Sequence, residues 1–176
     1  YCSIASISAN SEEMGALVAD ALLRVGSDGA VVCETGKELE DELEFSEGME
    51  HEVGWVTPKL IKEEETQTCT LIRPRVLVTD QKISMMTDIL PILEQIVGKE
   101  PLLIFSLDVS GEALSGLSLN KKRGVLDVCS VKAPGFGEVR RAYLEDIAIF
   151  SGATFVTADL ARKVENATLA DLGIVE

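Results

Sequence analysis

From Arg75 to Thr157 the sequence alternates short apolar runs with longer stretches in which apolar residues recur every three or four positions. Runs of the first kind predict strands, and stretches of the second kind predict helices. Such alternation is typical of an α/β domain with a largely parallel sheet, because parallel strands need a crossover connection. The expected elements are strands at 75–80, 101–106, 125–131 and 153–157, and helices ending near 98 and spanning 110–122 and 138–150.

The helix expected to end near residue 98 carries an unusually wide apolar surface. Two neighbouring stripes cover roughly 180° of its circumference, whereas a helix on the surface of a core needs only about 100°. Part of this surface either packs against a second buried neighbour or forms one wall of a hydrophobic groove. The two stripes are Ile83, Met86, Leu90, Leu93 and Val97, and Met85, Ile89, Ile92 and Ile96.

Pro91 limits where this helix begins. Proline interrupts a helix unless it occupies the first turn, where no amide hydrogen bond is lost. Asp88 as the N-cap residue would place Pro91 in that turn, and residues 83–87 would then form a separate turn. The wide apolar surface would in that case depend on residues 89–97 alone.

The helix expected at 110–122 has a second apolar feature outside its core stripe. Asp108 is its expected N-cap residue, and Leu119 points almost opposite to the core stripe. Two neighbouring helices with apolar groups outside the core form a groove suited to an extended or amphipathic peptide. The core stripe comprises Val109, Ala113 and Leu117, with Leu114 at its edge.

The N-terminal part of the chain has an apolar pattern of its own. Ser11 is a good N-cap residue for a helix that Gly26 ends, and a short strand is expected at Ala30–Cys33. Leu43 and Phe45 alternate with acidic residues and predict a half-exposed strand. Nine acidic residues between Glu34 and Glu52 resemble a solvated connector, so residues 1–42 are expected to form a separate domain or arm.

The charge and the apolar content exclude two classes of partner. The chain has 30 acidic and 16 basic residues and a net charge of −14. Nucleic acid is not an expected partner, because binding to phosphates needs a basic face. No stretch reaches the roughly 18 apolar residues of a membrane span, so no membrane partner is expected either.

The cysteines and the single histidine give little support for catalysis or metal binding. Cys2, Cys33, Cys69 and Cys129 are too far apart for a CxxC motif, and His51 is the only histidine. A metal site or a Ser/Cys–His nucleophile is therefore not indicated. Cys33 and Cys129 lie in apolar, strand-like runs, where buried and reduced thiols are usual, so a reducing compartment is expected.

Residues 132–137 lie between an expected strand and an expected helix, the usual setting of a phosphate-binding loop. Gly135 and Gly137 supply a G-x-G sequence, but Arg140 occupies the third glycine position and no Walker sequence follows. A structural turn is therefore favoured over a nucleotide site. An α/β enzyme that uses the 134–140 loop on a phosphorylated ligand remains an alternative hypothesis.

Several stretches resemble the group I chaperonins, the GroEL family, in order and spacing along nearly the whole chain. They are SISANSEEMGALVADAL at 6–22, DELEFSEGME at 41–50, GWVTP at 54–58, DQKISMMTDILPILE at 80–94, PLLIF at 101–105, DVSGEAL at 108–114, VKAPGFGE at 131–138, LEDIAIFSGA at 144–153 and ENATLADLG at 165–173.

The resemblance implies a domain organisation. Residues 43–176 would be most of an apical domain with its swivelling β/β/α fold, truncated at the C-terminal end. Residues 1–42 would be a helix–strand arm of the intermediate domain. The equatorial domain, which holds ATP and magnesium, would be missing. This piece is thus expected to bind no cofactor and hydrolyse no ATP, although the parent protein would be an ATP-driven chaperonin.

The resemblance also implies a binding site. In the family, a groove between two helices and a preceding loop binds non-native polypeptides and the mobile loop of a GroES-like co-chaperonin. Other chaperonin subunits are the expected partners in a ring. Burial of apolar surface, at about 25 cal/mol per Å², would drive binding with little hydrogen-bond readout. By matching position, the groove would be lined by Trp55, Leu60, Leu90, Leu93, Leu114 and Leu119.

Three departures from the family pattern bear on function. Lys59 and Ser118 stand where the family usually has apolar or aromatic groove residues, which predicts weaker polypeptide binding. Val53 stands where the family has an arginine in an inter-subunit ion pair, so family-type cooperativity is in doubt. A structural ring subunit with a weakened groove is therefore an alternative function. The departures favour an organellar subunit in the plastid stroma, with the mitochondrial matrix and the bacterial cytoplasm as alternatives.

Overall fold

The computed structural model describes residues 2–26, 29–36, 41–45, 48–49, 53–61, 67–160 and 162–175. The chain divides into two compact units, Tyr1–Met49 and Glu50–Glu176. The predicted boundary between residues 42 and 43 lies inside the first of these units. Within the described residues, no helix is long and apolar enough to cross a membrane.

The first unit is built on two helices, α1 (Cys2–Ala9) and α2 (Glu12–Val25), which pack against each other. As predicted, the Ser11 hydroxyl caps α2 by accepting a hydrogen bond from the Met14 amide at 3.3 Å, and Gly26 ends the helix. Helix α1 was not predicted. Gly15 permits its close approach, because a Cβ there would lie only 2.2 Å from the Ser6 hydroxyl oxygen.

The two strands predicted for this first unit are wrong. Residues 29–36 and 41–45 form no strand, and Val32 and Phe45 are exposed. A strand gains stability from a neighbouring ladder and from a face it can bury, and the described part of this unit offers neither. The predicted burial of Cys33 is wrong for the same reason, since its side chain is exposed.

The second unit is an α/β domain, which confirms the predicted fold class at this level. Its main sheet has the order β5-β3-β1-β6, all parallel, and β7 pairs antiparallel with the start of β1. A separate two-stranded parallel sheet pairs β2 with β4. The strands are β1 (Arg75–Thr79), β2 (Lys82–Ile83), β3 (Leu102–Ser106), β4 (Asp108–Val109), β5 (Val128–Lys132), β6 (Phe155–Val156) and β7 (Gly173–Ile174).

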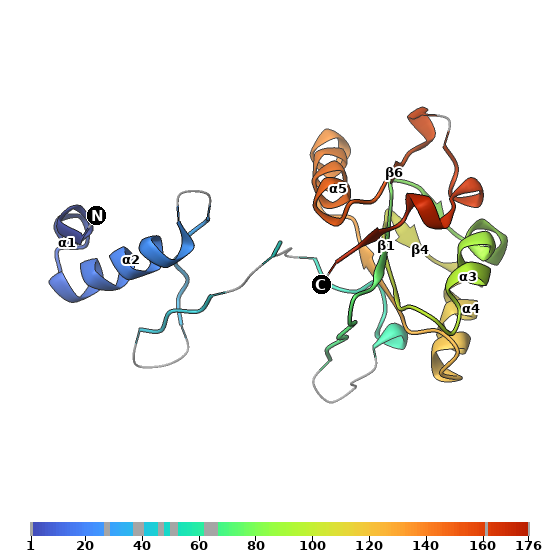
Figure 1. Ribbon diagram of the computed structural model, residues 1–176, viewed down its shortest axis with the longest axis horizontal. Coiled ribbons are helices and arrows are strands. Elements are labelled where there is room, and N and C mark those ends of the chain that lie inside the picture. Colours follow the sequence, from blue (N-terminus) through green and yellow to red (C-terminus); the bar gives the residue numbers. More distant parts are fainter. Residues whose placement is uncertain are drawn as a thin grey trace. The chain divides into compact units, whose positions relative to one another are not determined.

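Helices cover both faces of the main sheet, with α3 and α4 on one face and α5 on the other (Figure 1). The strands serve both faces because successive side chains point in opposite directions. In β1, Leu77 joins the core beneath α3 and α4, whereas Val76 and Val78 join the core beneath α5. The helices are α3 (Leu90–Ile96), α4 (Gly111–Lys122) and α5 (Gly137–Ser151), with short 3-10 turns at Pro58–Leu60, Met86–Asp88, Ala158–Leu160, Val164–Asn166 and Leu169–Asp171.

Helix α3 begins where the proline rule places it. Pro91 lies in the first turn, and residues 83–87 are separate from the helix. This agrees with the prediction of a shorter helix that begins just before Pro91. The N-cap residue is Ile89 rather than Asp88. The Asp88 carboxylate instead accepts hydrogen bonds from the backbone amides of Ser84 and Met85 and so fixes the preceding turn.

The predicted N-cap of α4 is also corrected. Ser110 occupies that position, whereas Asp108 belongs to β4 and forms an ion pair with Lys82 of β2 at 3.6 Å. The small sheet of β2 and β4 was not predicted, because two-residue strands carry no measurable alternation. It holds the start of α4 next to the turn that precedes α3, since the Ala113 amide donates to the Ser84 carbonyl.

Candidate functional site

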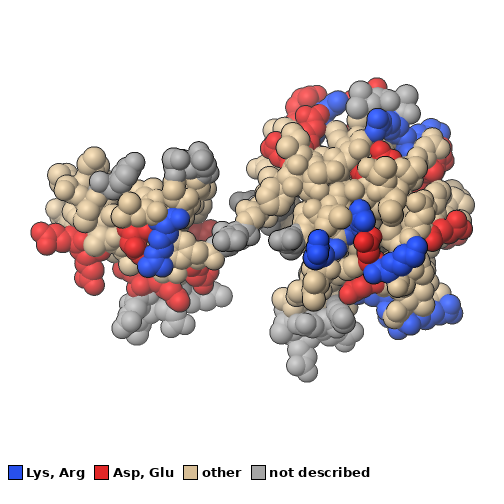
Figure 2. Space-filling model, in the orientation of Figure 1, with Lys and Arg blue, Asp and Glu red and all other residues tan. Residues whose placement is uncertain are grey.

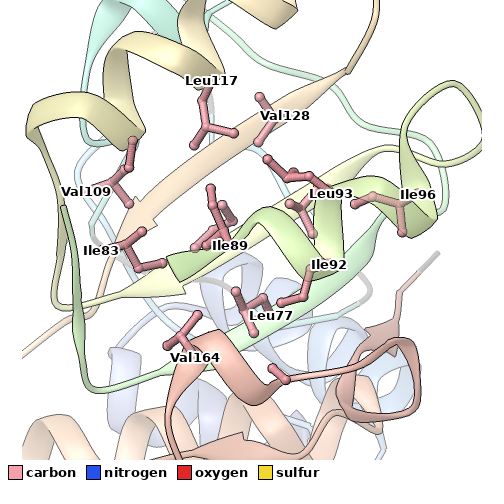
Figure 3. Close-up of a cluster of buried hydrophobic side chains, with 14 of the residues drawn as sticks. Leu77, Ile83, Ile89, Ile92, Leu93, Ile96, Val109, Leu117, Val128 and Val164 are labelled. Atoms are coloured by element: carbon pink, nitrogen blue, oxygen red, sulfur yellow. The ribbon is translucent and has the colours of Figure 1, made fainter. Parts of the chain in front are cut away.

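Helices α3 and α4 share one hydrophobic core and leave leucines outside it. Figure 3 shows Ile92, Leu93 and Ile96 of α3 in the same buried cluster as Leu117 of α4. Outside that cluster, Leu90 is 41% exposed and Leu119 is 48% exposed. The half-buried Leu114 packs against the edge of the core. We call Leu90, Leu114 and Leu119 together the α3–α4 surface.

Two of the predicted groove residues lie in the core instead. Leu60 is 0% exposed and Leu93 is 3% exposed, and both belong to the cluster beneath α3 and α4. In this structure they therefore support the α3–α4 surface without offering contact area to a ligand. Sequence periodicity alone could not place Leu60, because it lies in a 3-10 turn that shows no apolar repeat.

The segment that carries Trp55 runs beside β5 and α4. Trp55 forms an antiparallel bridge with Val131, and the Val56 amide donates to the Ser130 carbonyl at 2.8 Å. The half-buried Trp55 indole donates to the Gln67 carbonyl at 3.3 Å. These bonds fix the start of the segment, and the turn at Pro58–Leu60 then contacts α4.

The two polar departures from the family pattern occupy different environments. Lys59 is exposed on the turn at Pro58–Leu60. Ser118 is buried, and its hydroxyl makes no hydrogen bond with the residues that the structure describes. Only Lys59 therefore presents its polar group at the surface, while Ser118 affects the packing of α4. Val53 is half-buried.

Lys121 ties these elements together, and sequence reasoning missed it. Its side chain is only 8% exposed. Its ammonium donates to the Leu60 and Val128 carbonyls, each at 2.7 Å, and lies 3.3 Å from an Asp127 carboxylate oxygen. A lysine in the last turn of a helix usually interacts with water and with the helix dipole. Here it joins the end of α4 to the turn at Pro58–Leu60 and to β5.

The 132–137 loop has the conformation of a turn held by its own arginine. The Arg140 guanidinium donates two hydrogen bonds to the Gly135 carbonyl, at 2.9 and 2.8 Å, and Gly135 has a φ of +75°. The arginine that replaces the third glycine of a phosphate loop therefore closes this turn. Among the described residues no group of three or more His, Cys, Asp or Glu side chains could hold a metal ion.

The charged side chains on the visible face of the second unit are mixed in sign. Figure 2 shows Lys and Arg interspersed with Asp and Glu, without one continuous basic area. This distribution gives little attraction for a phosphate backbone, in agreement with the acidic composition.

Two curated relatives match almost the whole chain, although no family model matches it. The chaperonin GroEL of Acholeplasma laidlawii is 47% identical over 174 residues, which are 98% of this chain and 32% of that protein. The chloroplastic RuBisCO large subunit-binding protein subunit alpha of Chlamydomonas reinhardtii is 50% identical over 173 residues, which are 97% of this chain and 30% of that protein. The chain thus spans only about a third of the length of these relatives.

Proposed function

Because the chain belongs to the group I chaperonins, we propose that its second unit is the polypeptide-binding domain of a ring chaperonin that assists protein folding. In this proposal the α3–α4 surface receives non-native polypeptides. A GroES-like co-chaperonin competes for the same surface, and other chaperonin subunits complete the ring. Nucleotide binding is not a function that we assign to residues 1–176.

The observation that carries this proposal is the position of the leucines on α3 and α4. Leu90 and Leu119 expose apolar area on helices whose opposite sides are fixed in one core. A rigid apolar surface binds non-native chains by burial of apolar area, at about 25 cal/mol per Å², and requires no particular sequence in the client. We place Trp55 and the turn at Pro58–Leu60 at the edge of this surface, because the turn contacts α4 and Trp55 pairs with Val131 of β5.

The proposed cellular location follows from the relatives. One comes from a bacterium and the other from a chloroplast, so we propose the plastid stroma or the bacterial cytoplasm. The mitochondrial matrix, an alternative from the sequence, has no support from these two proteins.

The test is the binding of a fluorescently labelled, chemically unfolded and alkylated protein to the 176-residue chain, followed by fluorescence anisotropy. A Leu90→Glu/Leu119→Glu variant should raise the dissociation constant at least about tenfold, because it places two charges where apolar area is buried. Both side chains are exposed, so the variant should remain folded. Leu93→Glu would be uninformative, because a charge at that core position would unfold the domain.

Ile149→Glu provides the matched control. Ile149 is 79% exposed and lies on α5, on the opposite side of the sheet from α3 and α4 (Figure 1). This variant adds one carboxylate outside the proposed site, against two in the double variant, and should leave the dissociation constant unchanged. Equal weakening by both variants, or no weakening by either, would contradict the proposed site.

A structural ring subunit with a weakened groove is the second candidate. Two observations favour this candidate. Leu60 and Leu93 are buried, and the exposed Lys59 carries a charge, so each of these residues reduces the apolar area offered to a ligand. Lys59→Leu should tighten polypeptide binding if the groove is only weakened. If neither the wild-type chain nor Lys59→Leu binds the unfolded protein, the structural candidate replaces the binding one. Ser118 is less suitable for this test, because a larger side chain at a buried position would overpack α4.

A further inference from the structure

Two cysteines that are distant in the sequence meet at the Lys121 ammonium. Besides the Leu60 and Val128 carbonyls, Lys121 donates a hydrogen bond to the Cys69 sulfur at 3.4 Å. Cys129 follows Val128 directly in β5. Lys121 thus holds the Cys69 sulfur next to the start of β5, where Cys129 lies, and the two thiols are close enough to interact electrostatically. The fold therefore places both cysteines beside the same ammonium group.

The two thiols differ in their access to solvent. Cys129 is only 5% exposed, and burial, with a smaller contribution from the adjacent Cys69, raises the pKa of its thiol to about 12. Cys69 is half-buried and is therefore the more accessible of the two residues. Oxidation by a peroxide needs access to the sulfur atom as well as the thiolate form. Cys69 is consequently the thiol that a small oxidant meets first.

We propose that Cys69 and Cys129 are a redox modification site that forms a reversible intramolecular disulfide when a hydroperoxide is present. This proposal does not depend on the proposed chaperonin function. It also differs from a CxxC site, because the fold rather than the local sequence brings the two sulfur atoms together.

The reaction has two steps. The Cys69 thiolate attacks one peroxide oxygen, the O–O bond breaks, and the leaving alkoxide or hydroxide takes up a proton to give an alcohol or water. The Cys69 sulfenic acid is then attacked by the Cys129 sulfur, which forms the S–S bond, loses its own proton and releases water. Two electrons pass from the two thiols to the peroxide. A dithiol such as dithiothreitol returns them by exchange.

The site is coupled to the segment that carries Trp55. The Ser130 carbonyl, directly after Cys129, accepts a hydrogen bond from the Val56 amide. The next residue, Val131, pairs with Trp55. Formation of the S–S bond draws Cys69 and β5 together and alters the contact between Cys69 and Lys121. A change in Trp55 emission on oxidation is therefore expected. This emission reports the event without any client or nucleotide.

The test uses the 176-residue chain with Cys2→Ser and Cys33→Ser, because these two exposed cysteines would otherwise react as well. Hydrogen peroxide is the probe, and mass spectrometry is the readout. The expected product is a monomer lighter by two hydrogen atoms, with the Cys69 and Cys129 tryptic peptides joined. Dithiothreitol should restore the original mass and the original Trp55 emission.

Two further variants assign the roles of the thiols. With Cys129→Ser added, oxidation should stop at a sulfenic acid on Cys69 that dimedone captures. With Cys69→Ser added, Cys129 should give no dimedone adduct. The proposal would be overturned if both thiols remained open to alkylation after peroxide treatment and denaturation. It would also be overturned if the disulfide formed only between two molecules, or if Cys69 advanced to sulfinic acid while Cys129 stayed reduced.

Discussion

The buried stripe of α3 and its N-cap residue includes Leu93 but not Leu90. Ile89, Ile92, Leu93 and Ile96 recur at intervals of three and four positions and are all buried. Leu90 lies at the border of this stripe, at the first position of the helix, and remains exposed. A shift of the buried stripe by one residue toward the C-terminus would bring Leu90 into it, so the start of α3 decides whether Leu90 is available to a ligand.

Leu93→Ala should lower the free energy of unfolding by about 2–5 kcal/mol, because it removes buried methyl groups and leaves a cavity. Leu90→Ala, the matched change on the same helix, should alter it by no more than about 0.5 kcal/mol. Urea unfolding followed by far-UV circular dichroism measures both. Similar losses in the two variants would show that Leu90 is part of the core.

The Asp171 carboxylate gives a pH-dependent contribution to stability. The backbone amide of Thr168, which donates to it at 3.0 Å, lowers the pKa of Asp171 below its usual range, and the Thr168 hydroxyl and Arg162 add to this effect. A lowered pKa in the folded state stabilises the protein above the pKa of the unfolded state. That stability is lost as the pH falls through the folded-state pKa.

Asp171→Asn should therefore be less stable than the wild type at pH 7, and this difference should shrink as the pH falls below about 4, near the pKa of an unperturbed aspartate. Urea unfolding at pH 7, 5 and 3 measures the difference. A difference that is constant with pH, or that grows toward pH 3, would contradict the stated role of Asp171.

At the scale of the elements, Lys121 connects three segments that the chain order separates. Its ammonium satisfies carbonyls from the turn at Pro58–Leu60 and from β5, although the lysine itself belongs to α4. The neighbouring Lys122 is exposed in the same last turn. The pair therefore offers a buried and a solvated lysine at adjacent positions.

Lys121→Met should lower the free energy of unfolding by about 1–3 kcal/mol, because it leaves hydrogen-bonding groups unsatisfied. Lys122→Met should have an effect within about 0.5 kcal/mol. Chemical denaturation of both variants tests this expectation. If the two variants lose the same stability, the ammonium of Lys121 contributes no more than a surface charge.

The elements show which structural features local sequence patterns can predict. The strands of the main sheet and the ends of the helices between Arg75 and Thr157 were predicted to within a few residues, because apolar periodicity and burial agree there, whereas β2 and β4 were missed. The strand at Ala30–Cys33 was predicted from composition, yet it depends on a partner strand that the local sequence does not reveal. For the site, helical spacing correctly placed Leu119 outside the core. No spacing rule links Lys121 to Leu60, because their contact exists only in the folded chain.

At the scale of the whole molecule, the second unit contains every strand in the described part of the chain and both buried clusters. The first unit contributes two helices with few buried side chains. The cores that hold α3, α4 and α5 therefore lie within Glu50–Glu176, and their stability should not depend on the first unit.

Residues 50–176 alone should unfold in one cooperative transition, with a midpoint of denaturation close to that of the 176-residue chain. Guanidinium unfolding of both proteins, followed by Trp55 emission, is the appropriate measurement, since Trp55 is the only tryptophan. A large fall in the midpoint would mean that the first unit contributes to the core of the second.

The central claim is that the α3–α4 surface is a working site for apolar peptides. It is tested most directly by titrating the chain with a peptide from the mobile loop of a GroES-like co-chaperonin, with Trp55 emission and calorimetry as readouts. We predict a saturable change in emission with matching heat, lost in Leu90→Glu/Leu119→Glu and retained in Ile149→Glu. A flat titration by both methods, or saturation that survives the double variant, would contradict the claim.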